Sequence, residues 1–222
     1  MSESKPSFKL LQRQNESLLK HFYQTALRKK YMAEEAISWQ GDPCEFVYFI
    51  VTGAVEIFRL SPAGREQILD RLSQGECFNL VPAVLDGGLN QTNARALTDC
   101  ELLLLAKGEF LQLLNAYPEF LKTVAIFYAE RLVRMTALIE NLSLYTVRQR
   151  VARFLIEQAD MIDQGQSIRW TQSDMAKRLG TVRDVLGRTL RKLADDGLVR
   201  FEHEKIVLVD RQQLEKEANG AL

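Results

Sequence analysis

Residues 170–199 read WTQSDMAKRLGTVRDVLGRTLRKLADDGLV and predict two helices joined by a tight turn. The hydroxyl of Thr171 can cap the first helix, and Gly180 suits the positive φ that ends it. The second helix opens immediately afterwards, at Thr181 or Val182. Two short helices with this spacing are typical of a helix-turn-helix, which places its second helix in the major groove of DNA.

The second predicted helix separates an apolar face from a basic face. Its inward stripe consists of Val185, Leu186, Leu190 and Leu193. The opposite face carries Arg183, Asp184, Gly187, Arg188 and Arg191. Seven basic and two acidic residues lie between Arg169 and Lys192, so positive charge is concentrated where contact with DNA phosphates requires it.

Individual contacts with DNA follow from side-chain chemistry. Arg183 and Arg188 can each offer a forked pair of donors to guanine O6 and N7, and Asp184 can accept from a cytosine amino group. Gln172 and Lys192 are better placed for phosphates. The predicted DNA-binding residues are Thr171, Gln172, Thr181, Arg183, Asp184, Arg188 and Lys192.

The segments on either side complete a DNA-binding domain over residues 146–214, followed by a tail at 215–222. Residues 197–209 (GLVRFEHEKIVLV) predict two short strands about a charged turn, which is the expected wing. Thr146 and Gln149 have the spacing of a capping box, so a new helix and a new domain begin there.

Residues 118–143 predict a long dimerisation helix. Apolar residues recur there at alternating steps of four and three, which is an a/d heptad seam. The seam residues are Leu121, Ala125, Tyr128, Leu132, Met135, Ile139 and Leu142. The alternative is an amphipathic helix packed on its own β domain, and the two arrangements can coexist along one helix.

Residues 1–117 predict a β-rich domain. Four glycines fall about 11 residues apart between positions 41 and 75, with β-prone runs between them. Residues 46–51, 54–58 and 66–72 are expected to form antiparallel hairpins, and residues 101–106 the closing strand. The predicted fold is α+β: an N-terminal antiparallel, jelly-roll-like β-roll, a long dimerisation helix and a C-terminal winged helix-turn-helix.

Composition excludes several other classes of protein. The chain has 222 residues, enough for two domains, with 29 basic and 29 acidic side chains, so its net charge points to no partner. No apolar run approaches the roughly 18 residues of a membrane span, so a cytoplasmic protein without a membrane partner is expected. Cys44, Cys77 and Cys100 are odd in number and widely spaced, which favours reduced thiols over disulfides or zinc.

An enzyme is not expected. The two histidines, His21 and His203, lie in different predicted domains and cannot form the His cluster of a jelly-roll metal site. No Ser-His or Cys-His-carboxylate arrangement is visible either. The other rival is a ligand-sensing or partner-binding module whose DNA specificity is degraded.

The order and spacing of these segments resemble the CRP/FNR superfamily of bacterial regulators, from about residue 8 to residue 214. Residues 53–66 (GAVEIFRLSPAGRE) are similar to the family's hairpin, 75–78 (GECF) to the start of its ligand cassette, and 179–188 (LGTVRDVLGR) to its recognition helix. The resemblance implies a cyclic-nucleotide-binding-type β-roll and a homodimer that reads a near-palindromic site in double-stranded DNA, with RNA polymerase as a further partner.

The cassette departs from nucleotide-binding members of that family. Those members have Gly-Glu and, later, Arg-Ser at four positions that hold Asn79, Leu80, Asn90 and Gln91 here. A buried phosphodiester needs a cation or backbone donors, and Leu80 cannot accept from a ribose hydroxyl. Met135 also replaces a small hydroxyl residue that faces the adenine in such members. Cyclic AMP is therefore not expected to be the effector.

Several other effectors stay open. Residues 1–43 contain no cysteine, which argues against an iron-sulfur cluster. Haem would need His21, Cys77 or a methionine as axial ligand, and redox sensing would need a low-pKa thiol. An apolar pocket could hold a small hydrophobic ligand or be packed shut. The predicted pocket residues are Phe78, Asn79, Leu80, Val81, Asn90, Gln91, Tyr128 and Met135.

The recognition helix also departs from the family. Val182 stands where the family has Ser or Thr, and Asp184 replaces the commoner Glu. Thr181 can cap in place of Val182, in which case the helix starts one residue early. That shift would change which bases Arg183 and Asp184 reach, and would affect Arg188 less.

Overall fold

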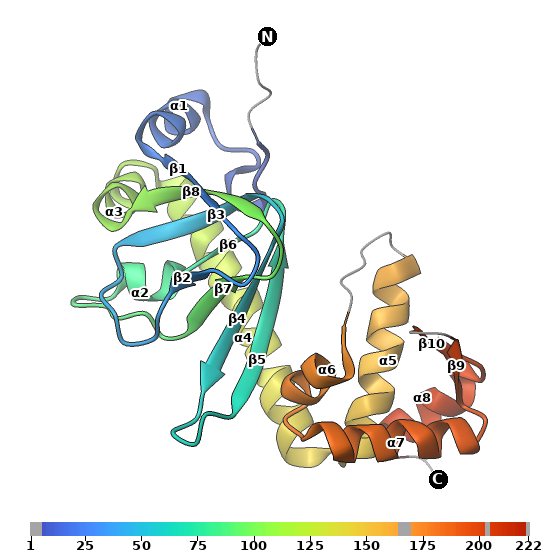
Figure 1. The fold of residues 1–222 in the computed structure, drawn as a ribbon. Helices are drawn as coiled ribbons and strands as arrows, with labels where there is room; N and C mark the ends of the chain where they lie inside the picture. The colour runs from blue at the N-terminus through green and yellow to red at the C-terminus, as the bar shows by residue number, and fades with distance from the viewer. Residues whose placement is uncertain (1–5, 164–169, 203–204, 221–222) are drawn as a thin grey trace. The chain divides into compact units, whose positions relative to one another are not determined.

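The computed structural model describes residues 6–163, 170–202 and 205–220. These residues form two compact units, one ending at Leu132 and the other beginning at Val133. The first unit is β-rich and the second is mostly helical (Figure 1).

Two four-stranded antiparallel sheets build the first unit within the described residues. One sheet has the order β1-β8-β3-β6 and the other β2-β7-β4-β5. The strands are β1 (Leu27–Tyr31), β2 (Ala36–Ser38), β3 (Phe46–Thr52), β4 (Ala54–Leu60), β5 (Glu66–Ser73), β6 (Cys77–Phe78), β7 (Asn93–Ala96) and β8 (Cys100–Ala106). Residues 101–106 are thus part of a strand, as predicted, and β8 pairs with both β1 and β3.

β3 is buried on both of its faces. Tyr48 and Ile50 pack in the core between the two sheets, while Val47, Phe49 and Val51 pack in a second core on the other side. Helices α1 (Glu16–Thr25) and α3 (Lys107–Ala116) contribute to that second core (Figure 1). Double burial explains why β3 has a continuous apolar run without alternation.

The predicted hairpin between residues 46–51 and 54–58 is wrong, because β3 and β4 belong to different sheets. Gly53 is the corner between them, with a φ of 84°. A Cβ at this position would lie 2.4 Å from the carbonyl oxygen of Asp99, so only glycine fits. The next connection, between β4 and β5, is an antiparallel hairpin as predicted.

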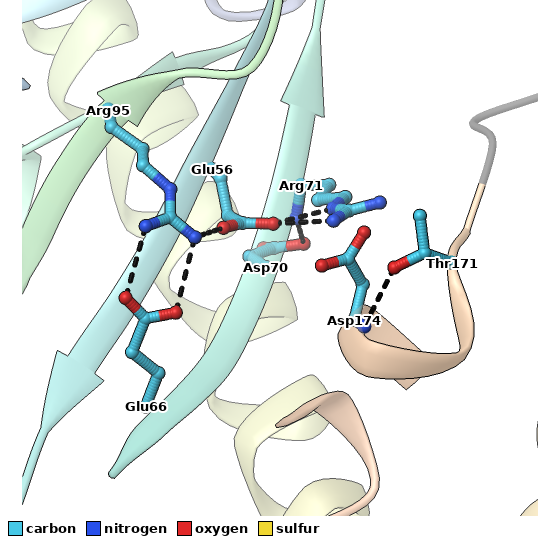
Figure 2. Close-up of polar contacts among 7 residues, drawn as sticks. All are labelled: Glu56, Glu66, Asp70, Arg71, Arg95, Thr171 and Asp174. Atoms are coloured by element: carbon cyan, nitrogen blue, oxygen red, sulfur yellow. Dashed lines mark hydrogen bonds and ion pairs between the residues drawn. The ribbon is translucent and has the colours of Figure 1, made fainter. Parts of the chain in front are cut away.

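A buried network of charges lies across β4, β5 and β7 (Figure 2). The Glu56 side chain is fully buried, with one carboxylate oxygen 2.7 Å from Arg71 and the other bonded to Arg95. Arg95 also bonds to Glu66 at 3.1 Å and stacks over the ring of Phe58, 4.5 Å from its centroid. Two acids and two arginines from three strands therefore neutralise one another.

A long helix, α4 (Pro118–Leu144), follows α3. A short helix, α2 (Leu80–Val84), lies earlier in the chain, and a 3-10 turn (Lys9–Leu11) precedes α1. Phe120 and Val124 of α4 are buried in the first unit, so the start of α4 packs on its own β domain.

The second unit contains the remaining helices and a two-stranded sheet. They are α5 (Val147–Asp163), α6 (Gln172–Arg178), α7 (Arg183–Asp195), β9 (Val199–Glu202), β10 (Lys205–Leu208) and α8 (Arg211–Asn219). The capping box predicted at Thr146 is confirmed: its backbone N–H donates to Gln149 Oε1 at 2.8 Å, and Gln149 N donates back to its hydroxyl at 3.3 Å. Arg148 then ties α5 to the ends of α7 and α8 through Asp196 at 2.7 Å and Glu217 at 2.9 Å.

Candidate DNA-binding surface and effector cassette

The helix pair α6–α7 begins and turns as the sequence predicts. Thr171 is the N-cap of α6, and its hydroxyl accepts a hydrogen bond from the backbone N–H of Asp174 at 3.1 Å (Figure 2). Gly180 has a φ of 63°, and the N–H of Thr181 donates to Ala176 O at 2.9 Å. This turn satisfies the free carbonyl groups at the end of α6 and sets the direction of α7.

Of the two predicted starts of the second helix, the one with Thr181 as N-cap is wrong. Val182 is the N-cap residue, with extended backbone and no side-chain cap, and α7 begins at Arg183. The first bond of α7 runs from the N–H of Leu186 to the carbonyl oxygen of Val182 at 3.0 Å, so the helix does not start one residue earlier, at Thr181. Asp184 lies in the first turn of α7, where a carboxylate interacts favourably with the helix dipole.

α7 presents one apolar face to the domain and one charged face to solvent. Leu186, Leu190 and Leu193 are completely buried against the other helices. Val185 is half-buried at the edge of that face. The exposed residues are Arg183, Asp184, Arg188, Arg191 and Lys192.

The arginines of this exposed face make no ion pair within the described part of the chain. Other arginines of the same unit are paired: Arg148 with two acids, and Arg211 with Asp160 at 2.6 Å and Glu215 at 2.9 Å. Arg183, Arg188 and Arg191 therefore keep their full charge and donor capacity for a partner.

Two further predicted contact regions lie beside α7. A Cβ added at Gly187 would lie 3.8 Å from Gln172 Oε1, so Gln172 approaches α7 near its middle. The wing predicted over residues 197–209 is an antiparallel pair, β9 with β10. Arg200 is ion-paired with Glu202 on that wing. His203 lies outside the described residues.

The cassette brings four of its predicted residues together. Asn79 has a left-handed backbone with a φ of 69°, and its Nδ2 donates to Asn90 Oδ1 at 2.9 Å and to Phe46 O at 3.0 Å. Leu80 is buried, and Phe78 stacks on Tyr48 with ring centroids 4.7 Å apart. Two of the three amides at positions that differ from nucleotide-binding relatives, Asn79 and Asn90, thus bond to each other.

The remaining predicted pocket residues are scattered. Val81 and Gln91 are exposed. The Tyr128 hydroxyl donates to Leu80 O at 2.8 Å, which joins α4 to α2, and burial raises the Tyr128 pKa to about 12. Met135 is half-buried and belongs to the unit that begins at Val133.

The candidate ligands for haem or redox sensing are engaged or buried. His21 Nε2 lies 2.7 Å from Glu109 Oε2. All three cysteines are buried, and desolvation raises the pKa of Cys77 to about 12 and that of Cys100 to about 11. No group of three or more metal-ligating side chains occurs in the ranges that the structure describes.

We predict that these thiols are inert in the folded protein at pH 8. A raised pKa keeps each thiol protonated, so native protein should react with Ellman's reagent on the order of 100-fold more slowly than unfolded protein. The neutral form is favoured in the fold, so this contribution to stability is complete below about pH 9 and is lost as pH rises towards 11 to 12. If one thiol of the native protein reacted as fast as it does in urea-unfolded protein, the prediction would be wrong and redox sensing would again be a candidate mechanism.

The seam residues of α4 divide into two groups. Leu121, Ala125, Leu132, Ile139 and Leu142 are exposed, while Tyr128 and Met135 are half-buried. Tyr128 is held by the Leu80 carbonyl, so this part of α4 contacts its own domain. The exposed leucines and Ile139 leave an apolar stripe uncovered.

Sequence reasoning did not anticipate two polar features of the first unit. Glu56 lies between inward-facing Val55 and Ile57, which predicts exposure, yet arginines from two neighbouring strands cover it. The bond between Asn79 and Asn90 joins residues on either side of α2 and has no sequence motif.

Two family models match the chain. The cyclic nucleotide-binding domain matches residues 28–117, and the Crp-like helix-turn-helix domain matches residues 149–217. Among the helices of the described residues, none is long and apolar enough to cross a membrane.

Curated relatives and solved structures agree with these models. The chain is 30% identical over 189 residues to the cAMP-activated global transcriptional regulator Vfr of Pseudomonas aeruginosa, covering 82% of this chain and 88% of the relative. It is also 30% identical over 195 residues to the cyclic AMP receptor protein of Thermus thermophilus, covering 87% and 88%. The matched relatives are transcriptional regulators, not enzymes.

Structural similarity extends over nearly the whole chain. The c-di-GMP responsive global regulator CLP of Xanthomonas campestris has a TM-score of 0.78 at 23% identity, covering 88% of this chain and all of that one. FixK2 of Bradyrhizobium japonicum has a TM-score of 0.70 at 26% identity, covering 86% and 96%. The predicted α+β fold is thereby confirmed.

Proposed function

The chain belongs to the CRP/FNR family of DNA-binding transcriptional regulators, and on that basis we propose that it is a homodimer reading a near-palindromic site through α7. The observation that carries this is the exposed face of α7, whose three arginines make no ion pair within the described residues. Two copies of α7 related by a twofold axis would contact half-sites about one helical turn apart. We place this activity in the cytoplasm, together with RNA polymerase.

The proposed contacts divide between bases and phosphates. Arg183, Asp184 and Arg188 lie on α7 where side chains can reach base edges. Thr171 and Gln172 at the start of α6, with Thr181 and Lys192, are proposed to contact phosphates, which fix the position of the domain on the duplex.

Selection of bound sequences from a random duplex pool tests this proposal. Wild-type protein is expected to enrich one near-palindrome at fixed salt, and Arg188→Ala is expected to lose about 1–3 kcal/mol per half-site with relaxed preference at one position. Arg211→Ala is the matched control, because that arginine is ion-paired on α8, and it should leave the selected site unchanged.

Two outcomes of the selection would contradict the proposal. Enrichment that is the same in Arg188→Ala would remove α7 from base recognition. Salt-sensitive binding to every duplex alike would instead indicate a module with degraded specificity.

We propose further that cyclic AMP is not the effector, although matched relatives are described as cAMP-activated. The sequence from Cys77 to Ala94 contains no lysine, arginine or histidine. The Asn79 amide donates to Asn90 Oδ1 and to the Phe46 carbonyl, and the buried Leu80 side chain offers no acceptor for a ribose hydroxyl. Adding cyclic AMP to the selection should therefore change neither the site nor its affinity, whereas a cyclic-AMP-dependent palindrome would contradict this.

Gly187→Ala should raise the stability of the second unit and lower its affinity for DNA. Alanine in this helix interior is expected to stabilise the second unit by about 0.5–1 kcal/mol, since the added Cβ makes only an ordinary contact with Gln172. The methyl group would stand on the face proposed to meet DNA, so operator affinity should fall. Gly108→Ala in α3, where a Cβ meets nothing within 4 Å, is the control and should leave affinity unchanged. Thermal unfolding and operator titration measure the two effects, and unchanged affinity in Gly187→Ala would contradict the assigned face.

A further inference from the structure

A second concentration of positive charge lies inside the unit that begins at Val133, in a cleft lined by α4, α5 and α6. Its volume is about 180 Å³. The charged residues that line it are Arg134, Arg150, Arg153, Arg178 and Glu157. Four arginines thus face one acid in a space smaller than the roughly 300–1,000 Å³ of pockets for drug-sized ligands.

Three arginines of this cleft, Arg134, Arg150 and Arg153, make no ion pair within the described residues. Arg150 donates only to the backbone carbonyls of Leu142 at 3.4 Å and Tyr145 at 3.2 Å among the residues described. Its Nε is buried without a hydrogen-bond partner, and desolvation lowers its pKa. Arg153 lies over the Tyr145 ring, 4.1 Å from the centroid, and Arg134 makes no ion pair in the described ranges.

Asn141 adds a second unsatisfied group to the cleft. Its Oδ1 is buried and has no hydrogen-bond partner. Rotating the Asn141 amide by 180° exchanges its oxygen and nitrogen without changing the shape of the side chain, and it puts Nδ2 where Oδ1 was. In that orientation Asn141 becomes another donor beside the arginines. Buried polar atoms without partners are rare in folded proteins, and a bound ion is one of the ways in which they are satisfied.

We propose that this cleft binds a small anion of the phosphate class that carries several negative charges. Guanidinium groups form paired hydrogen bonds to phosphate oxygens, and converging arginines favour a ligand with more than one charge. Arg150 lies in the first turn of α5, where the helix dipole adds to the positive potential. The ligand is either inorganic pyrophosphate or the phosphate chain of a nucleotide. The site is independent of the DNA-binding face.

Trp170 gives a signal for binding, because its ring packs at 5.3 Å and a right angle against Phe154, which lines the cleft. The experiment titrates full-length Trp39→Phe protein with sodium pyrophosphate in chloride buffer, using Trp170 fluorescence and calorimetry. Saturable binding at one site per chain is expected. Affinity should fall by about tenfold or more in the Arg134→Gln/Arg153→Gln variant, which loses two charge-assisted contacts. Lys122→Gln on α4 is the matched control and should bind as the parent does.

Further titrations and variants identify the ligand and the residues that bind it. Adenosine triphosphate binding about as tightly as pyrophosphate indicates recognition of the phosphate chain alone, and much tighter binding indicates a nucleotide; both support the proposal. Arg188→Ala should keep full affinity, which separates this site from DNA binding. Arg134→Gln alone replaces the double variant if circular dichroism shows that the latter is unfolded. Absence of saturable pyrophosphate binding, equal affinity in the cleft variants, loss in Arg188→Ala, or tighter binding of citrate would overturn the proposal.

Discussion

Replacing Leu132 and Ile139 together with glutamate should convert the proposed dimer to a monomer. These side chains are 68% and 65% exposed in the single chain and lie seven residues apart on the seam of α4. A second copy would bury them, and facing glutamates would then carry unpaired charge into the interface. Sedimentation equilibrium should show a single-chain mass, where the wild type shows twice that mass.

Loss of the dimer should also weaken operator binding by at least about 100-fold, because two half-sites would no longer be bound by one linked molecule. Val133→Glu is the matched control. Val133 is 71% exposed on the same helix but lies outside the a/d seam, so this variant should remain dimeric. A wild-type monomer, or a double variant that stays dimeric, would contradict the proposed interface.

Glu56→Ala should destabilise the first unit by about 3–5 kcal/mol, because it removes a buried carboxylate that is bonded to two arginines. Arg71 and Arg95 both bond to the Glu56 carboxylate, which is fully buried. Urea unfolding followed by Trp39 fluorescence in a Trp170→Phe background measures the effect on this unit alone.

The control for this prediction is Glu66→Ala. Glu66 bonds to Arg95 at 3.1 Å and is less buried than Glu56, with 19% of its side chain exposed, so its loss should cost about 1 kcal/mol. If both substitutions lowered the free energy of unfolding equally, the arginines would be solvated and the burial of Glu56 would not determine the stability of this unit.

The DNA-binding unit could be predicted from sequence almost residue by residue, because local chemistry determines it. The Thr171 cap, the left-handed Gly180 and the leucine stripe of α7 each act within a few residues of the chain. The start of α7 was the exception. Thr181 offers the better capping side chain, but the first bond of α7 is accepted by the Val182 carbonyl, and only the course of the backbone through the turn shows this.

The β unit was less predictable because its decisive contacts are distant in sequence. Gly53 reads equally well as a hairpin turn or as a corner between sheets, and only the nearby Asp99 carbonyl distinguishes them. Alternation placed Glu56 on the outer face of its strand but could not show that arginines from β5 and β7 cover it. Asn79 and Asn90 could be identified from sequence only as departures from the residues of nucleotide-binding family members. The structure alone shows that they bond to each other.

The continuity of α4 gives the molecule a mechanical property. Its 27 residues span about 40 Å, and the helix runs without a break through the point where one unit ends and the other begins. Such a rod is a lever: a tilt of about 5° at one end moves the other by about 3.5 Å, close to the spacing of successive bases in DNA. Repacking near Tyr128 that tilts α4 by this angle would therefore displace the far end of the helix by about one base step.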